Sequence, residues 1–413
     1  MKFIHVSDLH FGKNLFGYSM ITEGDQIFWI EQFLKLVRSE DPDAIVIAGD
    51  VYDRGIPPKE AVKLLDSFMT ELSSLNIPVF MIAGNHDSGE RLQFGSNLFK
   101  NNNIYIAGEV TKEIVHKTIE DEYGEVTFWL VPYLFPAAVE VALEDDDIKG
   151  YDMAMRKLLA AQNIDFSKRN VIISHQTVMN NGSSPETDGS ETAIGGVGDI
   201  DVSVYDGFDY VALGHIHAAQ KVGKDNIRYS GSPLCYHFGE LRKSHKGPVI
   251  VTLKEKGNFE YRIEELPVLH NMREIKGLFN DILEKESLSK AKNEYLRVVL
   301  TDERVPSGAR ATLLSLFESK NSKMMEIVHE PATRAKSEHK EREVKAEIKT
   351  IEDYFSLFYQ NRNNDEFPEE DDQMLISFIA EQVRHSSDDE KPTEPSLKDI
   401  DKIVEFVMKQ EAE

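Results

Sequence analysis

The sequence is long enough for more than one folded domain, and its composition excludes several classes of protein. It has 413 residues, 41% of them hydrophobic, which supports buried cores in two or three domains. The single cysteine excludes an internal disulfide and a thiolate-cluster metal site within one chain. No run approaches the ~18 apolar residues of a membrane span, and the first residues enter a strand pattern rather than a signal peptide. We therefore expect a cytoplasmic protein with no membrane association.

The formal net charge of −25 argues against simple electrostatic binding of nucleic acid, because Lys and Arg normally neutralise the phosphates. The excess charge is unevenly placed. Residues 350–413 hold 18 acidic against six basic residues, so the N-terminal body is much less acidic. Such a tail is typical of a solvated surface or of an interaction segment.

Residues 1 to about 265 alternate short apolar runs with amphipathic stretches, which predicts an α/β domain. Residues 25–38 and 58–75 have apolar side chains at helical spacing and predict helices that cover the sheet. Five apolar runs end in polar residues, and these runs are residues 3–6, 44–48, 79–83, 171–173 and 210–213. Ligands of open α/β sheets bind beyond the carboxyl ends of the strands, so we expect these polar ends to meet in one site.

A linker near Pro267 separates this body from a smaller segment, roughly 268–335, whose pattern predicts strand, helix, strand, helix, strand. Residues 336–350 are rich in Lys and Glu without an apolar stripe and predict a charged, solvated linker. Residues 351–385 carry apolar faces at helical spacing, which either dock onto a partner or pack against the body. From Ser386 to the end, the chain is an acidic tail.

Seven side chains of metal-ligand type follow the five predicted strands. They are Asp8, His10, Asp50, Asn85, His175, His215 and His217. Seven ligands suit two ions, with Asp50 as the carboxylate that bridges them. One ion would take Asp8, His10 and His217. The other would take Asn85, His175 and His215. Mixed carboxylate and imidazole ligation suits Mn, Fe or Zn better than Mg or Ca, and we expect manganese first and iron second. Glycine before Asp50, Asn85 and His215 fits sharp turns that aim these side chains at a shared centre.

Two cations in such a site would activate a water and stabilise negative charge on a phosphate, so no protein nucleophile is needed. His86 is placed to protonate the leaving oxygen. Asp53 and Asp87 are candidates to orient His86 or a ligand histidine, since ligating imidazoles usually donate their other N–H to a carboxylate. A single Asp-x-His or His-x-His motif is most often part of an ordinary polar surface. Five such sites in order, each directly after an apolar strand, predict a two-metal phosphoesterase.

These motifs resemble the calcineurin-like metallophosphoesterase superfamily, and the residues that carry the resemblance are Asp8-Leu9-His10, Gly49-Asp50-Val51-Tyr52-Asp53, Gly84-Asn85-His86-Asp87, Ser174-His175 and Gly214-His215-Ile216-His217. Within it, residues 7–13, 84–88 and 229–234 resemble the SbcD family of bacterial exonuclease subunits, and the similarity spans nearly the whole chain. The resemblance implies a metallophosphoesterase β-sandwich flanked by helices, a small α+β capping domain and C-terminal helices that bind a partner.

The resemblance also implies a manganese-dependent nuclease of DNA repair, with exonuclease action on duplex ends and endonuclease action on single strands or hairpins. Residues 1–267 would form the nuclease domain and 268–335 a DNA-capping domain. Residues 351–385 would bind the SMC-like ATPase SbcC, in a heterotetramer that contains a homodimer of this chain. Helices near 58–75 and 91–100 would form the subunit contact.

Three points stay open. Asp53 stands where relatives in archaea and eukaryotes often carry a histidine, which leaves its role uncertain. The same metal site would also serve a phosphoesterase for a small phosphodiester or a phosphoprotein, because fold does not determine substrate. A non-catalytic binding subunit would be expected to lack ligands, whereas all seven and His86 are present.

The basic residues that are candidates for phosphate contact are Lys13, Arg54, Arg91, Lys221, Arg242, Lys243 and Lys246.

Overall fold

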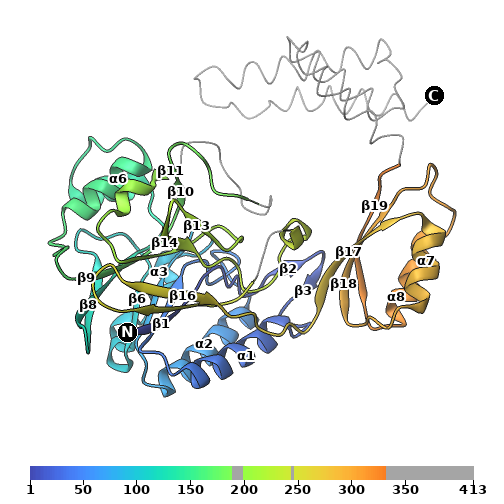
Figure 1. Ribbon diagram of the computed structural model, residues 1–413, viewed down its shortest axis with the longest axis horizontal. Helices are drawn as coiled ribbons and strands as arrows, with labels where there is room; N and C mark the ends of the chain where they lie inside the picture. Colours follow the sequence, from blue (N-terminus) through green and yellow to red (C-terminus); the bar gives the residue numbers. More distant parts are fainter. Residues whose placement is uncertain (188–198, 243–245, 332–413) are drawn as a thin grey trace, which may run out of the picture. The chain divides into compact units, whose positions relative to one another are not determined.

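Two six-stranded sheets packed face to face form the centre of the computed structural model (Figure 1). The structure describes residues 1–187, 199–242 and 246–331. The first sheet has the order β16-β15-β1-β4-β5-β6, and the second has the order β13-β14-β12-β9-β8-β7. The expected charged linker 336–350, the partner-binding helices 351–385 and the acidic tail lie outside the described residues.

The first sheet consists of β1 (Lys2–Val6), β4 (Ala44–Ala48), β5 (Val79–Ile82), β6 (Ile104–Ala107), β15 (Val249–Leu253) and β16 (Phe259–Ile263). The second consists of β7 (Val115–Asp121), β8 (Gly124–Val131), β9 (Arg169–His175), β12 (Tyr210–Gly214), β13 (Gln220–Val222) and β14 (Lys224–Tyr229). Two short pairs accompany them, β2 (Asn14–Leu15) with β3 (Tyr18–Ser19) and β10 (Thr177–Met179) with β11 (Asp199–Asp201).

The helices of this body are α1 (Asp25–Glu40), α2 (Lys59–Ser74), α3 (Gly89–Leu92), α4 (Ser96–Phe99), α5 (Pro136–Leu143) and α6 (Gly150–Ala160). Its short 3-10 turns are η1 (Lys100–Asn102), η2 (Val202–Tyr205) and η3 (Phe238–Arg242). Within the described residues, no helix combines the length and the apolar character that a bilayer crossing requires.

The five strands that the sequence predicts to carry site residues are all present. Strands β1, β4 and β5 are parallel neighbours in the first sheet, and β9 and β12 are parallel neighbours in the second. Both faces of these strands are covered, which explains unbroken apolar sequences such as Ala44–Ala48. Their division between two sheets confirms the sandwich that the resemblance implies.

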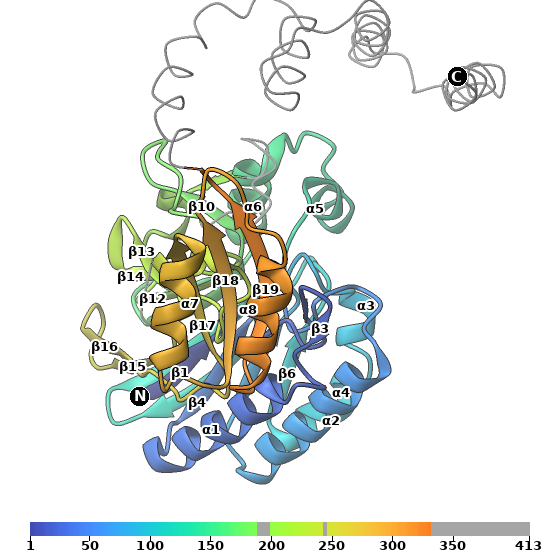
Figure 2. The same ribbon diagram turned by 90° about the vertical axis from the view of Figure 1, so that its right-hand side faces the viewer.

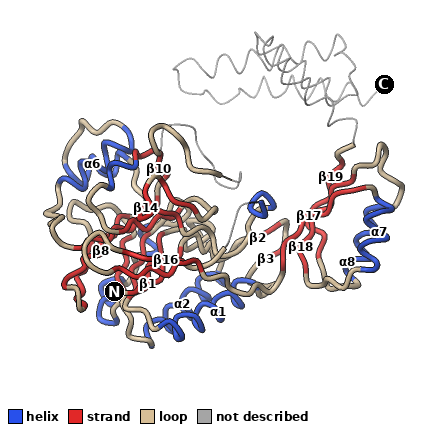
Figure 3. The backbone as a smooth tube through the Cα atoms, in the orientation of Figure 1, coloured by secondary structure: helices blue, strands red, loops and turns tan. Residues whose placement is uncertain are grey.

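Three apolar layers hold the sandwich together. Between the sheets, the rings of Phe80 and Phe128 stack with centroids 4.5 Å apart. On the outer face of the first sheet, α1 and α2 bury Phe33 and Phe68. On the second sheet, α6 buries Met155. The strands therefore lie between two helical layers, as Figure 3 shows.

A smaller module follows, with the predicted order of strand, helix, strand, helix, strand: β17 (Asn271–Gly277), α7 (Phe279–Leu288), β18 (Glu294–Leu300), α8 (Ala309–Glu318) and β19 (Lys323–His329). Its three strands are parallel, and α7 and α8 cover one face of its sheet (Figure 2). Tyr295 packs into the core of the larger body, and its hydroxyl donates to Asp25 Oδ2 at 2.6 Å. His270 Nδ1 lies 3.0 Å from the other oxygen of the same carboxylate.

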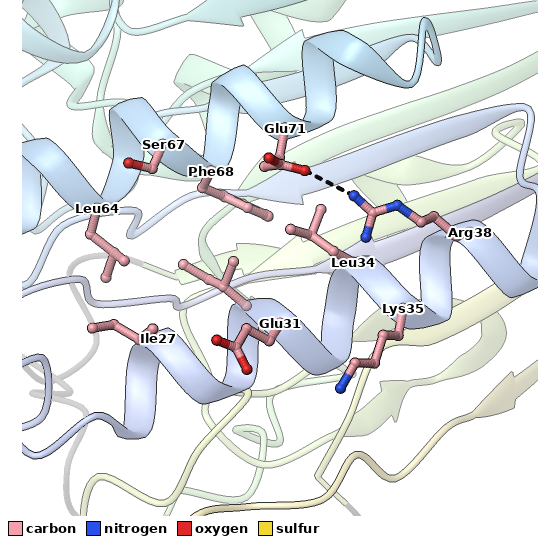
Figure 4. A pocket seen from close by; sticks show the side chains of 10 residues that line it. Ile27, Glu31, Leu34, Lys35, Arg38, Leu64, Ser67, Phe68 and Glu71 are labelled. Atoms are coloured by element: carbon pink, nitrogen blue, oxygen red, sulfur yellow. Dashed lines mark hydrogen bonds and ion pairs between the residues drawn. The ribbon is translucent and has the colours of Figure 1, made fainter.

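A groove runs between α1 and α2 (Figure 4). Ile27, Leu34 and Leu64 line it, and Arg38 donates across it to Glu71 at 2.8 Å. None of the predicted site residues lines this groove. The chemistry of the chain must therefore be sought at the strand ends.

Candidate metal centre

The polar residues that follow β1, β4, β9 and β12 converge on one point. Asp8, His10 and His217 each place a ligand-type atom within 4.8 Å of the others. Asp8 and Asp50 do the same with His175. Asp8 therefore belongs to both groups, and all five of these side chains are buried.

Asn85, from the loop after β5, completes the second group. Its Oδ1 lies 3.1 Å from His175 Nε2 and 3.0 Å from His215 Nδ1. His175 Nε2 is in turn 3.4 Å from Asp50 Oδ2. The structure thus brings all seven predicted ligands together, with Asp50 Oδ2 3.6 Å from His10 Nε2 and 3.4 Å from His175 Nε2. The division of these ligands between two ions, and their occupation by metal ions, stay predictions.

Four of these residues have left-handed backbone, which is unusual for residues other than glycine. Their φ angles are 55° at Asp8, 45° at His10, 49° at Asp50 and 101° at His215. Each such residue costs about 1–3 kcal/mol unless its surroundings hold it. The holding contacts run between the loops themselves: Asp8 N donates to Gly49 O at 3.0 Å, His10 N to Asp50 O at 2.9 Å, and His215 N to Asp8 Oδ1 at 3.0 Å.

The three glycines that precede site residues are needed for different reasons. Gly49 has a φ of 88°, as expected for a sharp turn. Gly84 and Gly214 do not have positive φ, and they are needed for space. A Cβ on Gly84 would lie 2.2 Å from Asp50 Oδ1, and a Cβ on Gly214 would lie 1.9 Å from Ala48 O. Close packing of the loops explains these two glycines better than the turn conformation we expected.

Two of the imidazoles are oriented by their second nitrogen. His175 Nδ1 donates to the Ala48 carbonyl at 2.7 Å, so its Nε2 faces the centre. His217 Nδ1 lies 3.3 Å from Glu240 Oε1, which fixes its ring in the same way. Lys246 Nζ lies 2.6 Å from the other oxygen of Glu240. The sequence analysis did not identify Glu240 as a site residue, because Glu240 does not directly follow a strand and forms no motif with His217.

Burial and neighbouring charges shift the pKa values of the titrating groups of the site in different directions. Burial raises the pKa of Asp8. At Asp50 burial acts in the same direction, but the charge of His175 outweighs it and lowers the pKa below its usual range. Burial alone would lower the pKa of His175, yet the Asp50 carboxylate raises it to about 9. Burial, followed by His175, lowers the pKa of His215 to about 3. The pocket therefore holds a carboxylate that needs a cationic neighbour.

The donor set fits divalent cations. His10 and His217 point their Nε2 atoms at each other across 3.2 Å, an arrangement in which two lone pairs must share a proton or a cation. His10 Nδ1 is buried and has no hydrogen-bond partner among the described residues. Carboxylate, amide and imidazole atoms directed at common points are the ligands that such ions take.

His86 lies beside the centre on the same loop as Asn85. Its ring meets the His10 ring edge-on at 4.8 Å, and its backbone N–H donates to Asp50 Oδ1 at 2.8 Å. Its Nδ1 lies 2.9 Å from the backbone carbonyl of Asp53. The Asp53 side chain instead pairs with Lys13 Nζ at 2.8 Å. The backbone carbonyl of Asp53 orients His86, whereas Asp53 Oδ1 lies 3.6 Å from His10 Nδ1. The carboxylate therefore faces a ligand histidine, which is the other role expected for it. His86 also places a nitrogen within 4.8 Å of ligand atoms of His10 and Asp50, close enough to act as a further ligand.

Asp87 has a supporting position. Its carboxylate accepts from the backbone N–H groups of Val51 at 3.0 Å, Tyr52 at 2.8 Å and Gly84 at 2.9 Å. Asp87 therefore ties the loop after β4 to the loop after β5. In the structure it orients backbone and does not contact His86 through its carboxylate.

Most of the basic residues considered for phosphate contact are engaged by carboxylates. Lys13 pairs with Asp53, Lys246 with Glu240, and Lys221 with Asp225 at 2.7 Å. Arg54 lies 3.6 Å from Asp53, and Arg91 is exposed. The side chains of Arg242 and Lys243 lie outside the described residues. Positive charge near the centre is thus largely neutralised within the chain.

Comparison with known proteins agrees with this geometry. Residues 1–219 match the calcineurin-like phosphoesterase family, and residues 268–363 match the family described as type 5 capsule protein repressor C-terminal domain, SbcD_C. The chain is 34% identical over 307 residues to the SbcD subunit of nuclease SbcCD from Staphylococcus epidermidis, covering 73% of this chain and 79% of the relative. The chain belongs to the SbcD family of calcineurin-like phosphoesterases.

A solved structure, that of TT1561 of Thermus thermophilus, is also similar, with 13% identity over 63% of this chain and 98% of that chain. Its TM-score is 0.36, too low to bear on the fold or the activity.

Substituting Gly214→Ala should disturb the centre through sterics alone. A new Cβ 1.9 Å from Ala48 O must push β12 away from the end of β4, so we expect the free energy of unfolding to fall by about 1–3 kcal/mol or more. Urea denaturation measures the loss. The matched control is Gly55→Ala, whose nearest neighbour atom would lie at 3.8 Å. Equal midpoints for the two variants would contradict the close-packing explanation.

Substituting Glu240→Gln should weaken metal binding without removing a ligand. The neutral amide no longer stabilises the N–H of His217, and loss of such an orienting partner typically costs about 10–100-fold in metal affinity. Calorimetric titration with Mn²⁺ measures the change. Glu71→Gln, on the exposed face of α2, serves as control and should leave the affinity unaltered. An unchanged affinity in Glu240→Gln would show that His217 does not depend on this carboxylate.

Proposed function

We propose that this chain is the nuclease subunit of an SbcCD-type complex, a cytoplasmic assembly that hydrolyses phosphodiester bonds of DNA. The observation that carries the proposal is the convergence of seven ligand-type side chains around the buried carboxylates Asp8 and Asp50, in a chain of the SbcD family. We assign Asp8, His10 and His217 to one ion. We assign Asn85, His175 and His215 to the other, with Asp50 bridging. Manganese is the expected metal and iron the second choice, since both accept mixed oxygen and imidazole ligands.

Two bound divalent cations would supply a water of lowered pKa and would stabilise the negative charge that develops on the phosphoryl oxygens. The protein then has to position groups and move one proton. Asp50 is fixed by the His86 backbone N–H, and His175 by the Ala48 carbonyl. Because the His86 Nδ1–H donates to the Asp53 carbonyl, Nε2 is the atom that can transfer a proton to the leaving oxygen.

The subunit contact of the proposed homodimer would lie on α2, α3 and α4. A hollow there is lined by Leu65, Met69 and Phe99, and its rim carries Phe94, with 83% of its surface exposed. Leu98 nearby is 71% exposed. Exposed apolar side chains at a hollow are typical of a protein interface. The SMC-like ATPase SbcC would be bound by residues 351–385, and the domain of residues 268–335 would cap the DNA.

A substrate assay tests this proposal. The full chain, alone and together with its ATPase partner, should cleave linear duplex, hairpin and single-stranded DNA with Mn²⁺, and Mg²⁺ should support the reaction poorly. A cyclic nucleotide and a phosphoprotein serve as competing substrates. Hydrolysis of either one, with no cleavage of any DNA in either preparation, would replace the nuclease by a phosphoesterase of another specificity.

Substituting His86→Ser should separate metal binding from turnover. Loss of a positioned acid typically costs about 10²–10⁴-fold in rate, while the seven assigned ligands remain in place. Cleavage of hairpin DNA and Mn²⁺ content by elemental analysis give the two readouts. His116→Ser, on the edge strand β7, is the matched control. A His86→Ser protein that keeps full rate would exclude the proton-transfer role, and one that loses metal would make His86 a ligand.

A further inference from the structure

Strand β8 ends at the same edge as the ligand-bearing strands but delivers aromatic side chains instead of ligands. It runs parallel to β9, with Val131 paired to Ser174, directly before His175. Beyond Val131, Tyr133 N donates to the Ala83 carbonyl at 2.8 Å, which ties this exit to the end of β5. The exit of β8 is therefore held at the metal centre, although it carries no carboxylate or imidazole.

A chain of ring contacts leads from the centre toward the surface. The Tyr133 ring lies 6.3 Å from the His175 ring and 6.4 Å from the His215 ring. Phe135 meets Tyr133 edge-on at 5.0 Å. Tyr151, from α6, lies 6.3 Å from Tyr133 and 6.5 Å from Phe135. Three aromatic rings thus form one cluster that begins beside two assigned metal ligands.

The outer part of this cluster is open to solvent. Phe135 is 55% exposed, and Val141 on the following helix α5 is 81% exposed. Helix α5, which lies beside α6 (Figure 2), buries only Val139 of its eight residues. The Phe135 ring thus remains in water next to a polar site, and a bound ligand with a flat apolar face would cover it.

We propose that Phe135, together with Tyr133 and Tyr151, forms a platform on which an unpaired nucleobase stacks when the neighbouring phosphate occupies the metal centre. The proposal rests on the proposed nuclease function and names the part of the substrate that the site selects. Every base offers a π-face, so such stacking binds single strands irrespective of sequence. In a duplex those faces are already stacked on one another, so the platform favours single strands, hairpin loops and frayed ends.

The charges around this cluster favour a base over a phosphate. The basic residues Lys13 and Lys246 beside the centre are paired with carboxylates, and the three aromatic side chains carry no charge. Residues 144–147, which follow α5 and precede Tyr151 in the chain, are all acidic, and Asp145 among them is paired with Lys157 at 2.6 Å. A phosphate would be repelled there, whereas an uncharged base is not. Stacking is thus a source of affinity that a chain of net charge −25 can offer to a nucleic acid.

A fluorescence measurement tests the platform without turnover. A single-stranded oligonucleotide containing 2-aminopurine is titrated in Mn²⁺ with the full chain carrying His86→Ser, which should keep its metal and lose turnover. In this background we expect quenching of the 2-aminopurine both with Phe135 in place and with Phe135→Trp. With Phe135→Ala we expect no quenching and an affinity lower by roughly 5- to 150-fold, the usual loss for one base–aromatic stack. Phe166→Ala is the matched control, because Phe166 is 43% exposed and precedes β9, at the opposite edge of the sheet.

An abasic strand identifies the contacted group. The same titration is followed by anisotropy on oligonucleotides that carry abasic sites. Phe135→Ala should weaken binding of the ordinary strand and leave binding of the abasic strand unchanged. Equal losses on both strands, or no loss on either, would overturn the proposal, as would a Phe135→Ala chain that binds DNA normally but fails to bind its ATPase partner.

The proposed nuclease function is judged separately, by Mn²⁺-dependent cleavage of DNA by the unaltered chain. If that chain cleaves ordinary and abasic strands and Phe135→Ala matches it in KM and in quenching, only the platform is lost. If the unaltered chain cleaves no DNA, the nuclease proposal itself fails.

Discussion

The burial of two carboxylates side by side is the constraint on which the rest of the site depends. Asp8 and Asp50 are each almost fully buried, and each costs free energy there unless positive charge compensates it. The chain surrounds them with imidazoles. In the part of the chain that the structure describes, the ion pairs of Asp50 are to His10 and His175 and include no Lys or Arg. Divalent cations remove the cost of burial more completely than imidazolium does. The site thus requires more positive charge than its own side chains supply, and divalent cations would supply it.

Strain in the loops follows from the same constraint. To bring carboxylates from separate strands to a common point, the chain must reverse direction within one or two residues of each strand. Asp8, His10 and Asp50 adopt left-handed backbone for this reason. Hydrogen bonds between the loops and the carboxylate of Asp87 hold them in place. A site assembled in this way is rigid before any ligand arrives, which is the condition for stabilising a transition state.

Much of the fold and of the site could be predicted from the sequence, because the signals are local. A strand buried on both faces is an unbroken apolar run, and the ligand follows it at once, as Asp50 follows Ala44–Ala48 and Gly49. The glycines could be recognised, but the need for space at Gly84 and Gly214 could not, because it arises from loops that are distant in sequence. Glu240 could not be predicted for the same reason. It reaches His217 only through the path that the chain takes between β14 and β15, and no periodicity encodes that approach.

A search for ligand residues does not find the end of β8. In this fold a strand can end at the site without carrying a residue that binds metal. What the six parallel strand ends share is a place at one edge of the sandwich, and residue type varies among them. Five ends carry oxygen and nitrogen donors, and that of β8 carries Tyr133 and Phe135. The oxygen and nitrogen ligands hold cations, and the cations in turn bind a phosphate. Every phosphodiester has a phosphate, so these ligands cannot distinguish one nucleic acid from another. Discrimination must come from groups that contact what differs between substrates, and the exposed faces of unpaired bases are such a feature. Aromatic residues at the end of one strand, beside the strand ends that carry the metal ligands, therefore allow one fold to assign catalysis and substrate selection to different residues.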